Sequence, residues 1–226
     1  MLQGWRELAY VHWPLSPVAV QRHLPPGLQV DTFDGTAWVG LVAFRMERIR
    51  LPGTPAVPYF GTFCETNVRT YVLGPDGQPG VWFHSLDVDR LLPVVVARAS
   101  YRLPYMWSKM SIEREDDRLT YTARRRWPGP RNASSKLAIR TDGPIADPSP
   151  LEHFLTARWG LYTQLGSRLT YAPVDHPAWP LERAELSHLD DELMAAAGYS
   201  TPAEPPLVHY SPVEVRIGLP RRVDHA

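Results

Sequence analysis

A chain of 226 residues can bury a full hydrophobic core without disulfide bonds, and a single domain over residues 1–226 is the simplest expectation. Acidic and basic residues balance at 24 each, and the resulting net charge of zero gives no electrostatic argument for binding nucleic acid or an acidic membrane. Cys64 is the sole cysteine, which excludes an internal disulfide and favours a cytoplasmic location.

Short extended segments dominate the chain from its start to its end. Alternating side chains bounded by turn residues predict strands over residues 5–13, 28–33, 36–46, 63–72, 80–86, 93–103, 105–114, 119–127, 136–140, 162–174, 181–189 and 207–217. Three short helices are predicted over residues 16–24, 151–161 and 190–197, because Ser-Pro pairs begin the first two and a glycine ends the third.

This order of elements indicates a mainly β (β-rich α+β) fold with the helices at its periphery. Many short strands favour a largely antiparallel barrel, closed or nearly closed, because closure removes sheet edges and leaves an inward face that can hold a ligand. The longest apolar run, residues 91–97, is too short to cross a bilayer, so no membrane partner is expected. Assembly into a homo-oligomer stays open.

The strand over residues 63–72 carries the most informative pattern in the chain. Its period of two places a carboxylate, an amide, a guanidinium and a phenol on one face, and these are Glu65, Asn67, Arg69 and Tyr71. The opposite face is apolar. Such a row is typical either of a polar face in water or of the wall of a binding pocket.

A turn-rich segment, residues 74–80, joins this strand to the next. A hairpin closed there places Trp82 near Tyr71 and His84 near Arg69 on one face, whereas a slip of one residue would reverse that face. The predicted register favours the pocket. Within it, Glu65 and Arg69 are either a structural ion pair or ligand anchors. His84 is either an acid/base or a core histidine.

Other site chemistries lack their motifs. The eight histidines include no His-x-His or His-Glu-x-x-His pattern, and Cys64 has no partner cysteine, so no metal is expected. There is no Gly-x-Ser-x-Gly elbow, no Gly-x-Gly-x-x-Gly and no phosphate loop. We therefore expect no serine nucleophile, no nucleotide and no cofactor.

Several phrases spread over nearly the whole chain resemble the YqjF-like family of uncharacterised proteins. They are Trp5 with His12-Trp13-Pro14, Leu24-Pro25-Pro26-Gly27-Leu28, Asp31-Thr32-Phe33-Asp34-Gly35, Trp38-Val39-Gly40-Leu41-Val42, Glu65-Thr66-Asn67-Val68-Arg69-Thr70-Tyr71-Val72, Gly80-Val81-Trp82-Phe83, Leu103-Pro104-Tyr105 and His209-Tyr210-Ser211-Pro212. That family is similar to the acetoacetate decarboxylase-like superfamily. The resemblance implies a cone-shaped, largely antiparallel β-barrel with a central cavity.

The decarboxylase mechanism gives this resemblance its chemical content. A buried lysine forms an imine with a β-keto acid, and a neighbouring cation lowers its pKa. Arg6 falls where the decarboxylase has an N-terminal arginine, and Glu65 where it has an active-site glutamate. The lysine pair falls on Tyr105 and Met106, so both catalytic amines are missing; Lys109 lies further along.

Three hypotheses follow. The first is a barrel that binds a small organic acid or keto compound. Its polar anchors would be Arg6, Arg69 and Glu65. Its walls would be Tyr71, Trp82 and Tyr105, and His84 would lie beside them. Such a barrel would have no lysine-imine decarboxylase activity. The second is a lyase or hydrolase of keto or acyl substrates with Glu65 or His84 as acid/base, Lys109 being a further catalytic candidate. The third is a scaffold with a filled core.

Overall fold

The computed structural model describes residues 2–50, 53, 55, 61–91, 94–95, 98, 103–166, 168–177, 179–217 and 221–222. Its strands are β1 (Leu2–Leu15), β2 (Gln29–Val30), β3 (Ala37–Arg50), β4 (Phe63–Leu73), β5 (Pro79–Val88), β6 (Tyr105–Glu115), β7 (Arg118–Trp127), β8 (Ser134–Pro144), β9 (Gly160–Leu165), β10 (Arg168–Asp175), β11 (Glu182–Asp191), β12 (Leu207–Ile217) and β13 (Arg221–Arg222). The helices are α1 (Pro17–Gln21), α3 (Pro150–Thr156) and α4 (Leu193–Ala196).

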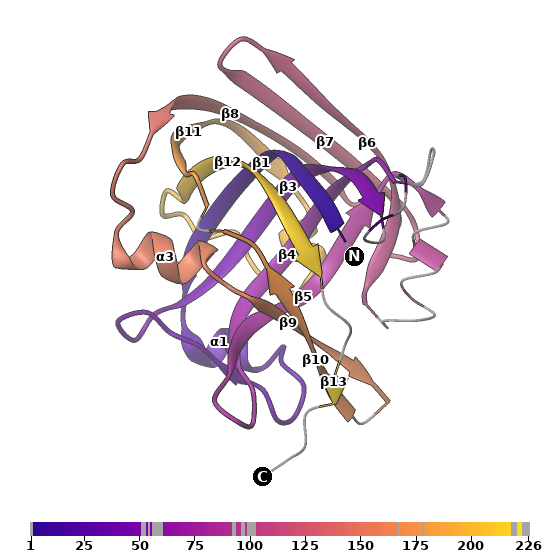
Figure 1. Cartoon of the computed structure of the whole chain (residues 1–226), viewed down its shortest axis with the longest axis vertical. Helices are drawn as coiled ribbons and strands as arrows, with labels where there is room; N and C mark the ends of the chain where they lie inside the picture. Colours follow the sequence, from indigo (N-terminus) through magenta and orange to yellow (C-terminus); the bar gives the residue numbers. More distant parts are fainter. Residues whose placement is uncertain are drawn as a thin grey trace.

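The strands close into a barrel, as the sequence predicted (Figure 1). Hydrogen-bonded neighbours run in the order β5-β6-β7-β8-β11-β12-β1-β3-β4, and β4 pairs with β5 to complete the circuit. Every pair in this circuit is antiparallel except β5–β6. β9 pairs with β5, and β10 pairs with both β9 and β12, so these two strands close a second circuit, β5-β9-β10-β12-β1-β3-β4, which shares the wall from β12 to β5 with the first.

The shared wall of β1, β3 and β4 is buried on both of its faces. One face lines the inside of the second circuit and packs with side chains from β9, β10 and α3; we call this cluster the inner core, and its members include Tyr10, Phe44, Tyr71, Leu155 and Val174. The other face lines the inside of the nine-stranded circuit and packs with β7, β8 and α4. Figure 1 shows β9 and β10 crossing in front of β4 and β5. A polar side chain on the inner face of β4 is therefore withdrawn from solvent.

Three predicted elements were wrong. Residues 93–103 were expected to be a strand, but the described positions Val94, Val95 and Arg98 are helical. Residues 162–174 are a hairpin of β9 and β10, because Gly166 adopts a positive φ of 65° and reverses the chain. The helix predicted over residues 151–161 ends at Thr156, and β9 begins shortly after it. The loop predicted over residues 51–61 lies largely outside the described residues.

The beginning of α3 is as predicted. Ser149 caps it, and the Glu152 side chain bonds back to the Ser149 backbone in a capping box. None of the helices in the described part of the chain has the length and apolar character needed to cross a membrane.

Candidate functional site

The predicted alternation along β4 is confirmed. Asn67 lies opposite Val42 on β3, and Glu65 lies opposite Phe44, both of the inner core. Glu65, Asn67, Arg69 and Tyr71 are all buried, with at most 6% of the surface of each exposed. Val68 packs on the opposite side of the sheet. The polar row thus faces the inner core and not water.

Glu65 is the buried acid of this row. Asn67 Nδ2 donates to its Oε1 at 3.1 Å, and the Tyr105 hydroxyl donates to its Oε2 at 3.3 Å. Burial raises the pKa of Glu65 to about 7, although these two hydrogen bonds and the charge of Arg69 act in the opposite direction. A carboxyl group with a pKa near neutrality can either give or take a proton at physiological pH.

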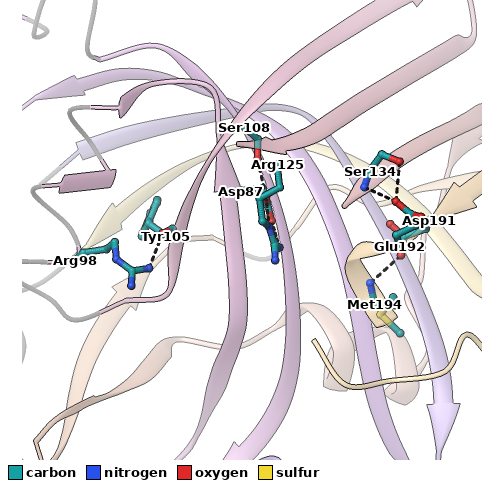
Figure 2. Close-up of polar contacts among 9 residues, drawn as sticks. All are labelled: Asp87, Arg98, Tyr105, Ser108, Arg125, Ser134, Asp191, Glu192 and Met194. Carbon is teal, nitrogen blue, oxygen red and sulfur yellow. Dashed lines mark hydrogen bonds and ion pairs between the residues drawn. The ribbon is translucent and has the colours of Figure 1, made fainter. Parts of the chain in front are cut away.

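Tyr105 places a phenol where the decarboxylase resemblance puts a catalytic lysine. It begins β6, directly after Pro104, and Arg98 Nη1 donates to its carbonyl oxygen at 2.9 Å (Figure 2). Burial and the nearby Glu65 raise the pKa of the phenol well above its usual value, so it stays neutral and acts as a hydrogen-bond donor. Glu65 therefore meets a neutral hydroxyl and not an amine.

Arg69 supplies a positive charge enclosed by aromatic rings. Its guanidinium carbon lies 5.2 Å from the ring centroid of Tyr10 and 5.8 Å from that of Tyr71. Among the ion pairs of the described residues none joins Arg69 to Glu65 or to another carboxylate. The ion pair between Glu65 and Arg69, which the sequence left as one possibility, is not formed. Among the described residues, no carboxylate pairs with the Arg69 guanidinium.

His12 on β1 completes this half of the site. Its Nε2 lies 2.6 Å from the Tyr71 hydroxyl, which donates in turn to the Leu155 carbonyl at 2.6 Å. Because a carbonyl can only accept, the Tyr71 proton is used there, and Nε2 of His12 must carry the other proton. Burial lowers the pKa of His12 well below its usual value. The ring is neutral, and Nδ1 keeps a free lone pair.

Buried polar atoms without a hydrogen-bond partner gather on this side of the sheet. Those in or beside the inner core are Tyr10 Oη, His12 Nδ1, Asn67 Oδ1, Arg69 Nε, Trp179 Nε1 and His209 Nδ1. Most buried polar groups in proteins are paired, so a cluster of unpaired ones needs an explanation. Donors and acceptors that converge among aromatic walls are typical of a ligand site.

Helix α3 lies against this site and contacts β12, the hydrogen-bonded neighbour of β1. Glu152 accepts from the Ser149 backbone with one carboxylate oxygen and lies 2.9 Å from Nε2 of His209 on β12 with the other. These hydrogen bonds help to lower the pKa of Glu152, although burial opposes them. Arg158, just after the helix, pairs with Asp31 at 2.6 Å and lies 5.1 Å from the Tyr71 ring centroid. The inner core is thus covered by ordered polar contacts.

Arg6, which was expected to be a polar anchor of the binding pocket, does not face the inner core. A bulge in β1 shifts the register between Trp5 and Leu8, with Glu7 at a positive φ of 51°. Trp5 and Leu8 therefore both face the inner core, although they are three residues apart. Arg6 is exposed on the other side.

The hairpin register was also wrong, by one residue. The turn pairs Leu73 with Pro79, so Tyr71 lies opposite Val81 and Arg69 lies opposite Phe83; the bulge between Val68 and Arg69 comes after these pairs and leaves His84 without an opposite residue on β4. Trp82 and His84 consequently lie away from the inner core. Trp82 packs beside Leu28 and Tyr162.

His84 has a separate environment of its own. Its Nε2 lies 2.9 Å from the Tyr199 hydroxyl, and its ring packs near His23. Burial lowers the pKa of His84 to about 3. Lys109 is exposed and lines a pocket with arginines of β7. The structure therefore brings together Glu65, Arg69, Tyr71 and Tyr105 of the predicted site residues, and it leaves Arg6, Trp82, His84 and Lys109 elsewhere.

Sequence reasoning missed Tyr10 and His12 as site residues. They stand two positions apart in the strand after Leu8, and this spacing puts all three on one face of β1. The signal in the sequence that could have revealed them is His12, a histidine within a mostly apolar strand. No group of three His, Cys, Asp or Glu side chains that could hold a metal ion occurs among the described residues.

The closed barrel, with a polar row buried on its shared wall, has the fold of the acetoacetate decarboxylase-like proteins. Acetoacetate decarboxylase from Legionella pneumophila superposes on 99% of this chain and 88% of its own, with a TM-score of 0.66 and 15% identity. The enduracididine biosynthesis enzyme MppR complexed with pyruvate covers 99% of this chain and 90% of its own, with a TM-score of 0.68 and 15% identity.

Residues 2–214 match DUF2071, a family described as an uncharacterized conserved protein, and the chain belongs to this family. Uncharacterized protein YqjF of Bacillus subtilis (strain 168) is 33% identical to it over 216 residues, which cover 93% of this chain and 87% of that protein. The resemblance to the YqjF-like family is thereby confirmed.

Proposed function

We propose that this protein binds a small organic acid, a carboxylate or keto acid, against the polar row of β4. The observation that carries the proposal is the buried Arg69 guanidinium, which lies among tyrosine rings without a carboxylate partner among the described residues. Burying an uncompensated charge is costly, and a ligand carboxylate would offset that cost. The Tyr10 hydroxyl lies on the same side, beside the Arg69 guanidinium, and can donate a further hydrogen bond to such a ligand.

The local charge balance favours an anion. Glu65 has a pKa of about 7, so near neutral pH much of it is protonated and only partly offsets Arg69. His12 is held neutral by burial and by the nearby positive charge. One of the structurally similar proteins is complexed with pyruvate, which is a small keto acid. This likeness supports the ligand class.

The test is a comparison of matched acids and amides. Small carboxylates, including pyruvate, should raise the melting temperature more than their amides, because only the acids pair with Arg69. Arg69→Met keeps most of the side-chain volume and should abolish the difference between acid and amide. Arg6→Ala is the matched control, since this exposed arginine lies outside the site. Equal shifts for acids and amides in the unsubstituted protein would favour a scaffold whose core is simply filled.

A second candidate function rests on Glu65. A buried carboxyl group with a pKa near 7, hydrogen-bonded to a neutral phenol, suits proton transfer at a carbon next to a keto group. Exchange of the methyl protons of pyruvate for deuterium in heavy water, followed by NMR, tests this activity. Glu65→Gln should abolish the exchange and His84→Gln should retain it, because His84 lies away from the inner core. Exchange that survives Glu65→Gln would rule out this role.

Lysine-imine decarboxylation is not part of the proposal. The imine requires an unprotonated amine beside the bound acid, and Tyr105 contributes a hydroxyl at the matching position. Lys109 is exposed, among other cations. We expect borohydride reduction in the presence of acetoacetate to leave the intact mass unchanged. An adduct that maps to Lys109 and disappears in Lys109→Met, together with release of CO2, would restore the decarboxylase assignment.

A further inference from the structure

A second set of polar residues lies outside the inner core, on the outer face of the β6–β7 hairpin. Lys109 on β6 is directly opposite Arg124 on β7, and both side chains are exposed. Like charges directly opposite each other on neighbouring strands are destabilising. The fold therefore places a repulsive pair at this position.

Two more arginines extend this group of cations. Arg126 occupies the bulge of β7, between the residues that pair with Trp107 and Ser108, and its guanidinium lies 4.8 Å from the Trp107 ring centroid. Arg131 comes from the connection between β7 and β8. The backbone of Arg125 bonds to Asn132 and Ala133 at 2.9 Å each, which folds this connection back onto β7. The loop thereby presents its cation to the same place.

These side chains surround a pocket of about 460 Å³. Its lining consists of Lys109, Arg124, Arg125, Arg126, Arg131 and Asn132. No acidic residue is among them. The chain as a whole has equal numbers of acidic and basic residues, so this concentration does not reflect a generally basic protein.

Only Arg125 in this lining is neutralised by a carboxylate among the described residues. Its Nη2 and Nε donate to Asp87 at 2.6 and 2.9 Å, and Ser108 also donates to Asp87 at 2.6 Å (Figure 2). No ion pair of the described residues includes Lys109, Arg124, Arg126 or Arg131. Four positive charges therefore converge on one pocket without compensation in this part of the chain.

We propose that this pocket is a binding site for the polyphosphate group of a small phosphorylated ligand. A terminal phosphate carries about 1.5 to 2 negative charges and each further phosphate of the chain adds about one, so a di- or triphosphate matches the four cations. Arginine forks suit phosphate oxygens geometrically. A groove for single-stranded nucleic acid follows a backbone over several nucleotides, whereas these cations converge on one place. Trp127 follows Arg126 and is 44% exposed; it is not part of the pocket lining, but its ring is accessible to a base carried by the ligand.

The test uses calorimetric titration of the full chain with inorganic tripolyphosphate and with ATP, at constant ionic strength. Both should bind, and binding should weaken as salt is added. The double variant Lys109→Gln/Arg124→Gln and the single variant Arg131→Gln should weaken binding by about tenfold for each cation removed. Arg118→Gln is the matched control, because Arg118 is an exposed arginine of the same strand that does not line the pocket. It should change the dissociation constant by less than about twofold.

Several outcomes separate this proposal from its alternatives. Equal affinity for ATP and tripolyphosphate identifies the phosphates as the recognised group. Tighter binding of ATP, with quenching of tryptophan fluorescence, identifies a nucleotide as the source, and both results support the site. The proposal is overturned if neither probe binds, if Arg118→Gln weakens binding as much as the pocket variants, or if a single-stranded oligonucleotide binds more tightly at equal phosphate concentration.

Without ligand, the double variant should melt no lower than the unsubstituted protein, because it removes a repulsive pair. A lower melting temperature would contradict the repulsion from which the site was inferred.

Discussion

The Tyr71 hydroxyl lies 2.6 Å from Nε2 of His12 and donates to the Leu155 carbonyl, so it joins β4, β1 and α3 at one point. This arrangement fixes which nitrogen of His12 carries the proton, and it leaves Nδ1 with a lone pair and no partner among the described residues. The geometry of the proposed acid site therefore depends on one phenol.

Tyr71→Phe should destabilise the protein by about 1–3 kcal/mol, because it leaves a buried N–H and a buried carbonyl without a partner. Urea unfolding measures the change. Tyr199→Phe is a useful control, since the Tyr199 hydroxyl bonds to His84 alone among the described residues. A loss no larger than that of Tyr199→Phe would show that the Tyr71 bridge contributes little.

Gly40→Ala should also destabilise the protein, through His12. A Cβ at Gly40 would lie 2.7 Å from Cδ2 and 2.8 Å from Nε2 of His12, so the ring must move away from Tyr71. Overpacking of this kind costs about 1–3 kcal/mol. At Gly4, also on a buried strand, a Cβ would meet its nearest neighbour at 3.5 Å, which is ordinary contact. Thermal unfolding of both variants should separate them, and similar melting temperatures would contradict the crowding argument.

Glu65 should make stability fall as pH rises. Its pKa is about 7 in the folded protein against an ordinary value of 4.5, so between these values the folded state holds a proton that the unfolded state has lost. Stability is therefore greatest below pH 4.5 as far as Glu65 is concerned. It declines up to about pH 7 by a total on the order of 3 kcal/mol.

Glu65→Gln removes this titration. The variant should unfold at higher urea concentration than the unsubstituted protein at pH 8, and the difference should shrink toward pH 4. Glu113→Gln, an exposed glutamate on β6, serves as the control and should follow the unsubstituted protein. Parallel pH profiles for Glu65→Gln and the unsubstituted protein would mean that Glu65 does not titrate in this range.

Asp87→Asn should be among the most damaging polar substitutions. It breaks a buried pair in which both side chains are at most 1% exposed, and it leaves the Arg125 charge without compensation. Losses of about 3–5 kcal/mol are typical of such a change. In contrast, Arg140 and Asp117 are more than half exposed and 3.5 Å apart, and Asp117→Asn should cost less than about 1 kcal/mol. Chemical unfolding of the two variants measures this contrast, and equal losses would refute it.

Local patterns determined the main features of this protein. Alternation in residues 63–72 predicted which side chains of β4 share a face, because the two-residue period of a strand is a property of its backbone alone. The Ser149-Pro150 pair predicted where α3 begins, since capping depends on residues within one turn of the helix. Short strands bounded by turn residues predicted a closed, mainly β fold.

Only the tertiary structure decided which of these faces met. A bulge at Trp5/Leu8 changed the register of β1 by one residue and turned Arg6 outward, and the turn between β4 and β5 set Arg69 opposite Phe83 instead of His84. A bulge depends on the balance of packing on both sides of a sheet, so a single strand does not encode it. His12 joined the site through contacts with residues 59 and more positions away in the chain. Folding also placed Lys109 opposite Arg124. Buried side chains fix the register between β6 and β7, so the two cations meet on the exposed face although they repel each other.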